Sequence, residues 1–549
     1  MSLIVIIYAL INYKITSLNA NNTFVGGDIS GEMFAIKIAT KANLIGVINT
    51  VGWPHGFGLW AEPLLGLGPY YFALIISKLF AFSNVAIIYT LTMAAGIMFN
   101  SIAAWWMVAK EFSDKKFALY FGLIIGISPF ALMRFGHMPV AWLFFPLIFL
   151  GIAFRLSRNQ ISRGRAVLIL AITGLWSPLW WIIVFLLIAL LINVVQLINL
   201  KKNKKNCIDW FMILIGTTIS LIPSLILNFL SRNYAGQTSR FPWQSNQFGG
   251  KFSDILLSSP FINQAFELKT KLSEGVSPES INSLVGIVLG IFVFYLILQI
   301  LLNQKIQNEF LPTNFYLISV VILLFFVTGG FGNLQSGLLV ILDQVSPARS
   351  WFRLIFFLGI LGLFLFLKEI ENRKLRSTTI NILMSGSILL TIFDSQFIEF
   401  PKAVNKQDIA EYNAVKFLDS TTQNCPVLQI PVDTFPLLQD FTFSNGSKFA
   451  YNQLIPFLLS DNNQWSLVGI PGNKYWEEYK AIPTELENTD FLEFKEQGFC
   501  AILFDKDFSD WQITRKAGVD FTQGLWPGLK VNVENPDFED LRYKVYLLD

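Results

Sequence analysis

The sequence contains little charge, few cysteines and almost no histidine. Of its 549 residues, 14% are charged, three are cysteine and two are histidine. No two cysteines have the Cys-x-x-Cys spacing, which argues against a zinc site and against a thiol redox centre. The net charge of +3 is small, which does not suggest a nucleic-acid partner. The glycine-rich stretch 329–332 is not followed by Lys and Ser or Thr, so it is not a phosphate-binding P-loop.

Long apolar runs are what the sequence has in abundance. Hydrophobic residues make up 53% of the chain and the mean hydropathy is +0.51, which is typical of an integral membrane protein. A helix that crosses a bilayer needs about 20 apolar residues, and the stretches 84–108, 138–156 and 179–200 meet this length. About eleven such runs can be placed between Ser2 and Phe397, so we predict about eleven transmembrane helices.

The basic residues gather in alternate gaps between these runs. Short loops rich in Lys and Arg stay in the cytoplasm, so the pattern predicts a cytoplasmic N-terminus and an extracytoplasmic C-terminus. It also places two long loops outside, 15–83 and 231–282. The first run, 3–11, lacks basic residues before it and a cleavage site after it, so we expect a span rather than a signal peptide. The basic gaps are 110–116, 155–165, 201–205, Lys305 and 368–376.

The first outer loop contains two further apolar stretches. Both 31–41 and 69–82 have the spacing of helices that lie at the membrane surface. The alternative is that 65–82 spans the membrane, which would put the later basic gaps outside unless the first span is discarded. The charge pattern favours the surface interpretation.

From Pro401 onward the composition changes to that of a soluble α/β domain. We therefore predict an α-helical polytopic membrane domain over 1–398 and an extracytoplasmic α/β domain over 399–549, long enough for its own core. Cys425 and Cys500 each open an expected strand, and an oxidising compartment would permit a bridge, but the sequence does not place the two strands side by side. The expected helices are 408–420 and 484–497, and the expected strands are 426–432, 500–504 and 543–548.

Several short motifs follow one another on the predicted outer side. They are Gly26-Gly27-Asp28, Gly52 to Gly56 with a later Gly68-Pro69, Ser128-Pro129 before Arg134 and Gly136-His137, Thr173-Gly174 with Pro178, Arg349 with Arg353, and, in the C-terminal part, Val427 to Pro431, Trp465-Ser466 to Gly472 and Gly498-Phe499. In this order and sidedness the chain resembles the GT-C superfamily of membrane glycosyltransferases. The C-terminal part is similar to the outer domain of uncharacterised bacterial members from polysaccharide gene neighbourhoods, the YfhO-like branch. One departure is Ser177, where some lipid A-modifying relatives carry Lys, so their acceptor specificity is not carried over.

The resemblance implies transfer of a sugar from a polyprenyl-phosphate donor to a glycan or lipid acceptor at the outer face of a bacterial plasma membrane. It gives Asp28 the role of general base toward the acceptor hydroxyl, with Gly26 and Gly27 allowing a tight turn before it. The alternative is that Asp28 has a structural role only, as an exposed turn residue or a helix N-cap. Glu32, one helical turn further on, either shares the site or is a solvated side chain.

The departing phosphate should meet cations, and arginine binds phosphate oxygens with two parallel hydrogen bonds. Arg349 and Arg353 are the candidate pair, with Arg134 next; the alternative for Arg353 is a side chain that reaches to the lipid headgroups. His55 and His137 would bind phosphate, hydrogen-bond the sugar or ligate a divalent ion such as Mg²⁺ or Mn²⁺ with Asp28, or else be ordinary turn residues. The sequence leaves the metal question open.

A rival interpretation is a transporter or scaffold of cell-surface polysaccharide assembly that catalyses nothing. Ion-coupled transporters place ionisable residues at mid-membrane depth. The predicted span interiors here are nearly free of charge, so we favour the enzyme. Its expected partners are the lipid-linked sugar donor, the acceptor and the bilayer.

Overall fold

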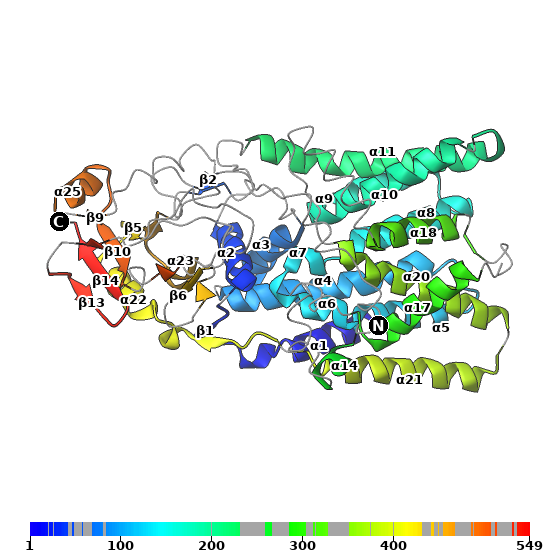
Figure 1. Cartoon of the computed structure of the whole chain (residues 1–549), viewed down its shortest axis with the longest axis horizontal. Coiled ribbons are helices and arrows are strands. Elements are labelled where there is room, and N and C mark those ends of the chain that lie inside the picture. Colours follow the sequence, from blue (N-terminus) through cyan, green and yellow to red (C-terminus); the bar gives the residue numbers. More distant parts are fainter. Residues whose placement is uncertain are drawn as a thin grey trace.

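The fold is that of a computed structural model, in which a helical bundle carries a small β-sheet region at one end (Figure 1). The structure describes residues 1–19, 21–25, 27–41, 47–48, 57–58, 68–80, 84–198, 200–230, 259–265, 285–302, 311–312, 314–327, 351–373, 375–398, 400–430, 441–443, 448–449, 454–466, 485–486, 488–506, 511–512, 530–531 and 535–548.

Helices account for most of the described residues before position 398. They are α1 (Ser2–Asn12), α2 (Gly27–Lys41), α3 (Gly68–Phe80), α4 (Val85–Val108), α5 (Lys115–Gly126), α6 (Pro129–Met133), α7 (Met138–Ala141), α8 (Phe144–Ser157), α9 (Arg163–Leu175), α10 (Leu179–Ile198), α11 (Leu200–Leu230), α14 (Pro260–Ala265), α17 (Ile287–Leu301), α18 (Phe315–Val327), α20 (Ile355–Asn372) and α21 (Ser377–Ser395), with the 3-10 turns η1 (Ile15–Ser17), η3 (Arg134–Gly136) and η4 (Trp351–Leu354).

Six helical segments within the described residues are long and apolar enough to cross a membrane, which identifies a membrane protein. Three shorter apolar helices accompany them, so the expected total of about eleven spans stays a prediction. The six are Val85–Val108, Lys115–Gly136, Met138–Ser157, Leu179–Ile198, Lys204–Pro223 and Ser377–Ser395, and the shorter ones are Ser2–Asn12, Ile287–Leu301 and Phe315–Phe326.

Four of the five basic gaps, those within the described residues, lie together at one end of the bundle. Lys368 Nζ donates to the carbonyl oxygen of Glu111 over 2.6 Å, and Arg158 Nε lies 3.7 Å from the Glu111 carboxylate. Arg163 pairs with Asp209 at 2.7 Å. These contacts join four of the predicted cytoplasmic loops or their flanks, as the alternation of charge requires. Which side of the membrane this end occupies remains a prediction.

The run 138–156, expected to be one continuous span, is broken between α7 and α8 at Trp142 and Leu143. Asn100 Nδ2, inside α4, donates to the carbonyl of Ala141 over 2.7 Å, and Asn100 Oδ1 accepts the amide N–H of Leu143 over 2.7 Å. Hydrocarbon could not satisfy these two backbone groups. The segment is still long and apolar enough to span a membrane, as predicted, and the residue that makes its break tolerable lies on another helix.

The described C-terminal residues form a five-stranded sheet with the order β13-β14-β10-β5-β8. Strands β10, β5 and β8 are parallel, with β8 at the edge of the sheet, and β14 pairs with β10 in the antiparallel sense. The expected strands 426–432, 500–504 and 543–548 correspond to β5, β10 and β14. The strands of this sheet are β5 (Pro426–Ile430), β8 (Gln464–Trp465), β10 (Ala501–Asp505), β13 (Phe538–Glu539) and β14 (Tyr543–Leu547), and the helices are η5 (Lys406–Asp408), α22 (Tyr412–Thr421), α23 (Leu454–Leu459) and α25 (Asn488–Glu496).

The remaining strands are short pairs outside this sheet. They are β1 (Asn22–Thr23) with β4 (Val404–Asn405), β2 (Val47–Ile48) with β3 (Phe57–Gly58), β6 (Phe441–Phe443) with β7 (Lys448–Phe449) and β11 (Trp511–Gln512), and β9 (Glu485–Leu486) with β12 (Lys530–Val531).

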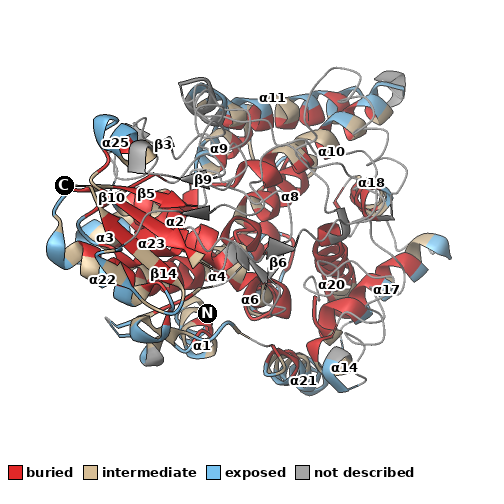
Figure 2. Ribbon diagram, turned by 60° about the vertical axis from the view of Figure 1, so that its left-hand side comes forward, coloured by how far each residue is buried: buried red, intermediate tan, exposed pale blue. Residues whose placement is uncertain are grey.

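The sheet region is packed onto the bundle. The pair β1–β4 joins the first loop to the chain just after α21, and the amide of Lys406 donates to the carbonyl of Asn21 over 2.7 Å. One apolar core runs from α1 through α2, α4 and α8 into α22, α23 and β5. In Figure 2, α2 and α23 are almost wholly buried, whereas α21 and α11 expose much of their surface. The division at 398/399 therefore stays a prediction about folding units.

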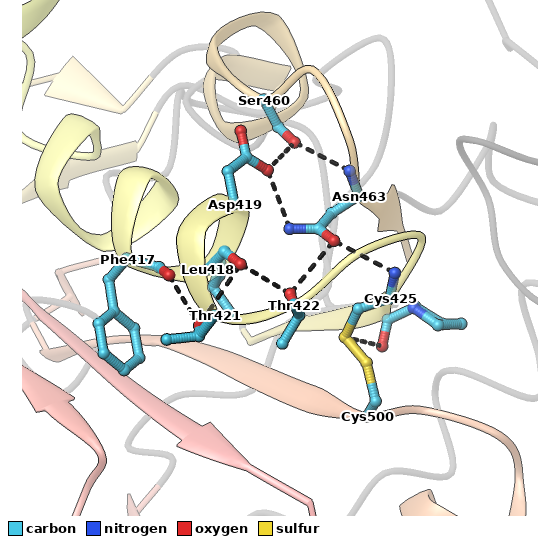
Figure 3. Close-up of a disulfide and its surroundings, with 10 residues drawn as sticks. Phe417, Leu418, Asp419, Thr421, Thr422, Cys425, Ser460, Asn463 and Cys500 are labelled. Atoms are coloured by element: carbon cyan, nitrogen blue, oxygen red, sulfur yellow. Dashed lines mark hydrogen bonds between the residues drawn. A yellow bond between two sulfur atoms is a disulfide. The ribbon is translucent and has the colours of Figure 1, made fainter.

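Cys425 and Cys500 form a disulfide (Figure 3). They immediately precede β5 and β10, which pair in parallel with Val427 opposite Ala501. Their Cα atoms are 5.8 Å apart, a usual separation for bridged cysteines. The bridge that the sequence left open is thus formed by strand neighbours.

We expect the double variant Cys425→Ser, Cys500→Ser to lower the free energy of unfolding of the sheet region by about 2–4 kcal/mol, because the bridge closes a long loop. Thermal unfolding in detergent measures the loss, and mass spectrometry of unreduced peptides detects the bridge. The control is Cys207→Ser, which replaces the buried free cysteine in α11. Finding two free thiols in protein exported to an oxidising compartment would contradict the pairing.

We expect Asn100→Leu to destabilise the bundle by about 2–4 kcal/mol, since it leaves a buried carbonyl and a buried amide without partners. The neighbouring variant Ser101→Ala removes one hydrogen bond, from the Ser101 hydroxyl to the carbonyl of Gly122, and should cost about 1 kcal/mol. Thermal unfolding of the two variants side by side tests this. Equal losses would mean that Asn100 does not stabilise the break.

Candidate functional site

Helix α2 carries the proposed base at its start. It begins at Gly27, so Asp28 lies in its first turn, and α2 packs against α3, α4 and η3. Every residue from Ile29 to Ala39 is buried. A helix at a membrane surface would expose one face, so the expectation of a surface helix over 31–41 is wrong. The neighbouring elements cover α2 on all sides.

Helix α3 forms one wall around α2. As described, it is 13 residues long, or about 20 Å, which is shorter than the hydrocarbon layer of about 30 Å. The alternative of a span at 65–82 includes residues outside the described ones, so the choice between the two interpretations stays a prediction. Its first residue, Gly68, lies so close to the carbonyl of Trp176 that a Cβ atom there would overlap it. Close contact with the turn after α9 therefore requires glycine at this position.

Glu32 is buried, with 8% of its surface exposed. The hydroxyl of Tyr70, on α3, donates to Glu32 Oε2 over 2.8 Å. The interpretation of Glu32 as a solvated side chain is therefore wrong, because α3 covers this face of α2. The bond fixes a carboxylate one helical turn from Asp28, and the sequence alone had no signal that selects Tyr70.

Arg134 lies in η3, directly beside α2. Its side chain is 1% exposed, and its guanidinium lies 5.6 Å from the ring centre of Phe130. The turn is held by Tyr89, whose hydroxyl donates to the carbonyl of Phe135, and by the amide of His137, which donates to the Arg134 carbonyl over 2.8 Å. The half-buried His137 thus belongs to the same turn as Arg134, as the sequence placed it.

Arg353 lies in η4, at the start of α20, and is 7% exposed. Its guanidinium lies 5.1 Å from the ring centre of Trp180. A side chain buried beneath an indole does not reach out to headgroups, so that alternative does not hold. The neighbouring Trp181 donates from its indole nitrogen to the carbonyl of Val140, in α7, over 3.2 Å. Arg353 is thereby linked, through two tryptophans, to the short helix that follows His137.

Several proposed residues lie outside the described residues. These are Gly26, His55 and Arg349; for Gly27 and Asp28 the structure gives the backbone. Within the described part of the chain, no three His, Cys, Asp or Glu side chains form a group that could hold a metal ion. Whether a divalent ion takes part is thus left to experiment.

The described elements nevertheless come together in a definite way. The start of α4 lies beside the first loop, where Asn84 Nδ2 donates to the carbonyl of Asn19 over 2.6 Å, and α4 ends at the basic gap 110–116. The helix with Asp28 and Glu32 and the turn with Arg134 and His137 are therefore neighbours at the end of the bundle opposite the basic gaps (Figure 1). A helix with a buried carboxylate beside a turn with a buried arginine is an arrangement that can bind a polar, phosphorylated ligand.

We expect Tyr70→Phe to lower the free energy of unfolding by about 1–3 kcal/mol, because it removes a donor from a buried carboxylate. The control is Tyr412→Phe, at a half-buried position on α22. Thermal unfolding of both variants, alone and combined with Glu32→Gln, gives the coupling energy of the Glu32–Tyr70 pair. A coupling of zero would show that this bond does not hold α2 against α3.

Comparison with known proteins gives similarity at low level only. No family model matches the chain, and no curated protein does. Among solved structures, an oligosaccharyltransferase from Archaeoglobus fulgidus in complex with Zn and sulfate is 12% identical with a TM-score of 0.43, over 92% of this chain and 67% of that one. The oligosaccharyltransferase AglB from the same organism, in complex with an inhibitory peptide and a dolichol-phosphate, is 13% identical with a TM-score of 0.42, over 92% and 69%.

The arabinofuranosyltransferase AftD from Mycobacteria is 14% identical with a TM-score of 0.39. The alignment covers 88% of this chain, which spans about a third, 36%, of that protein. Likeness of this degree establishes neither a shared fold nor a shared activity. The chain is thus similar, at this low level, to an oligosaccharyltransferase and an arabinofuranosyltransferase, and its function has to be argued from its own residues.

Proposed function

We propose that this chain is a membrane glycosyltransferase of GT-C type. It would transfer a sugar from a polyprenyl-phosphate donor to a glycan or lipid acceptor at the outer face of a bacterial plasma membrane. The observation that supports this most is the packing of α2, which begins with Gly27-Asp28, against the turn that contains Arg134. This contact brings the helix that begins with the proposed base beside the turn that contains a proposed phosphate-binding residue, at the bundle end opposite the basic gaps.

Asp28 takes the role of general base in this proposal. In an inverting transfer, the acceptor oxygen forms a bond to the anomeric carbon while the bond from that carbon to the phosphate oxygen breaks. The Asp28 carboxylate accepts the hydroxyl proton, and polyprenyl phosphate leaves with the electron pair of the broken bond. Gly27, directly before Asp28 in the sequence, has no side chain of its own that would obstruct the carboxylate.

The arginines take the charge of the leaving phosphate. Arg134 and Arg353 are buried under aromatic rings, and a guanidinium fixed in an apolar setting interacts with a phosphate more strongly than one in water. Arg349, four residues before Arg353, is the third cation of this set. Glu32, held by Tyr70, would accept a hydrogen bond from a sugar hydroxyl or orient the acceptor, and His55 and His137 would donate to the phosphate or to the sugar.

The rival, a transporter or scaffold without a catalytic step, makes a different demand on the same residues. A binding protein needs the arginines but no proton acceptor, so neutralising Asp28 would leave its function intact. A glycosyltransferase needs both. The two proposals can therefore be distinguished by one substitution, provided that donor binding and turnover are measured separately.

We expect Asp28→Asn to lower the release of polyprenyl phosphate by about 10²–10⁴-fold, the usual contribution of a general base, while donor binding is retained. The matched control is Asp408→Asn, at an exposed position in η5. The assay uses the purified full chain in lipid nanodiscs with polyprenyl-phosphate sugars, with and without a chelator, and follows the released lipid phosphate by mass spectrometry.

Turnover that survives in Asp28→Asn would show that another residue is the base. Donor binding without turnover in either form, across the glycan and lipid acceptors tried, would favour the non-catalytic rival. A loss of turnover with chelator, restored by Mg²⁺ or Mn²⁺, would assign a divalent ion to the reaction.

A further inference from the structure

A lysine is buried in the middle of α2. Lys37 is 4% exposed, and its Nζ donates to three carbonyl oxygens, those of Phe457 over 2.7 Å, Leu458 over 3.1 Å and Ser460 over 2.5 Å. An ammonium group has three N–H donors and no acceptor, so the three bonds use its full capacity. These carbonyls belong to the last turn of α23 and the residue after it, where a helix leaves its carbonyls without amide partners.

The lysine lies within a larger contact between α2 and α23. The ring of Phe34, one turn earlier on α2, packs edge-on against Phe457 with ring centres 5.3 Å apart, and Lys37 Nζ lies 5.0 Å from the centre of the same ring. Lys41, one turn later, is exposed and lies 3.4 Å from the carbonyl of Asp461. Positions 34, 37 and 41 are on one face of the helix, and this face packs against α23 and the turn after it.

The face that carries the proposed base is the other one. Lys37 is nine residues after Asp28, which at about 100° per residue puts the two on opposite sides of α2. The Asp28 side also carries Glu32, which bonds to Tyr70 on α3. Helix α2 is therefore held by the C-terminal region on its Lys37 face and by α3 on its Glu32 face.

The acceptor carbonyls are themselves firmly held. Asp419, on α22, accepts hydrogen bonds from the Ser460 hydroxyl over 2.7 Å, from the amide of Asp461 over 3.1 Å and from Asn463 Nδ2 over 2.9 Å. Asn463 Oδ1 accepts the amide of Cys425, at the disulfide, over 3.1 Å. Figure 3 shows this network joining α22, the turn after α23 and the bridged strands. Lys37 thus binds a part of the C-terminal region that is itself held in place by hydrogen bonds.

Burial makes the position unfavourable for a charge. It lowers the pKa of Lys37 to about 7, with a further lowering from Lys41 and an opposing effect of the carboxylate of Asp461, 4.0 Å away. An apolar side chain of the same length would fill the space without that cost. The lysine instead fixes the position of α2, because its three hydrogen bonds to three held carbonyls define where this part of the helix lies.

We propose that Lys37 is a positioning residue, which fastens α2 to the end of α23 and so sets the place of the proposed base at the front of the helix. The inference rests on the proposed function and adds to it. The C-terminal region then takes part in transfer by holding the catalytic helix, in addition to any contact it makes with a glycan. A displacement of about 1 Å at a reacting group can cost about a hundredfold in rate.

The test uses the full chain with Cys207→Ser. The native cysteines that remain, Cys425 and Cys500, are bridged and do not compete for a thiol reagent. Cysteines in place of Phe34 and Phe457 report the contact by their rate of reaction with a short bifunctional thiol reagent. We expect Lys37→Met to slow this cross-linking about tenfold, and the matched control Lys41→Met to leave it unchanged, because only Lys37 uses all its donors in the contact. Asp419→Asn, on the other side of the contact, should slow it as well.

Turnover is measured on the same proteins before and after cross-linking. We expect Lys37→Met to lower kcat about a hundredfold with KM for the donor unchanged, and cross-linking to restore kcat to that of the cross-linked parent with Lys37. A tether can replace a positioning residue but not one that touches the substrate.

Cross-linking that is as fast in Lys37→Met as in the parent would overturn the proposal, as would a kcat that the tether fails to restore. If the parent itself shows no turnover, the proposed function fails, and the cross-linking rates still decide whether Lys37 holds α2. An intact Cys425–Cys500 bridge in each variant shows that the C-terminal region has folded.

Discussion

The absence of water inside a bilayer is the constraint on which the rest of this structure depends. Every buried polar group must find its partner within the protein. Charged side chains are accordingly gathered at the two ends of the bundle, in the network around Glu111 and Lys368 at one end and around α2 and η3 at the other. Where the helix is interrupted between α7 and α8, the side-chain amide of Asn100 forms hydrogen bonds with the carbonyl of Ala141 and the amide of Leu143.

The same constraint explains how the candidate site is built. A carboxylate, a lysine and two arginines are buried, and each lies against a specific neighbour: Glu32 on Tyr70, Arg134 on Phe130, Arg353 on Trp180, and Lys37 on the end of α23. Such groups are costly to bury, and their fixed geometry is what a site for a phosphorylated sugar needs. The C-terminal region contributes through the contact behind α2, since one continuous core joins it to the bundle.

Local patterns predicted those parts of the fold that depend on neighbours in the sequence. The apolar runs predicted the helices, the alternation of basic gaps predicted which loops meet, and short β-branched and apolar stretches predicted β5, β10 and β14. Helix 408–420 was expected four residues too early, because Lys406–Asp408 forms a 3-10 turn before α22 begins at Tyr412. Such errors at element ends are expected where capping contacts decide the boundary.

Positions that depend on distant residues were predicted less well. The helix over 31–41 was expected at a membrane surface and is instead enclosed, because α3, α4, η3 and α23 cover it. In the sequence, Glu32 and Lys37 cannot be told apart from charged residues on a solvated helix face. Tyr70 likewise looks like any other residue of an apolar helix. Their burial follows from partners 38 and about 420 residues away along the chain, which no local pattern encodes.

The sequence by itself determined that this is a helical membrane protein whose basic residues fall in alternate gaps between its apolar runs. These properties follow from hydropathy and charge, which act on each segment separately. Only the tertiary structure decided that α2 is clamped between α3 and α23, that Arg353 lies beneath Trp180, and that Cys425 faces Cys500. The reason is that a buried polar group is placed by its partner, and that partner is chosen by packing in three dimensions.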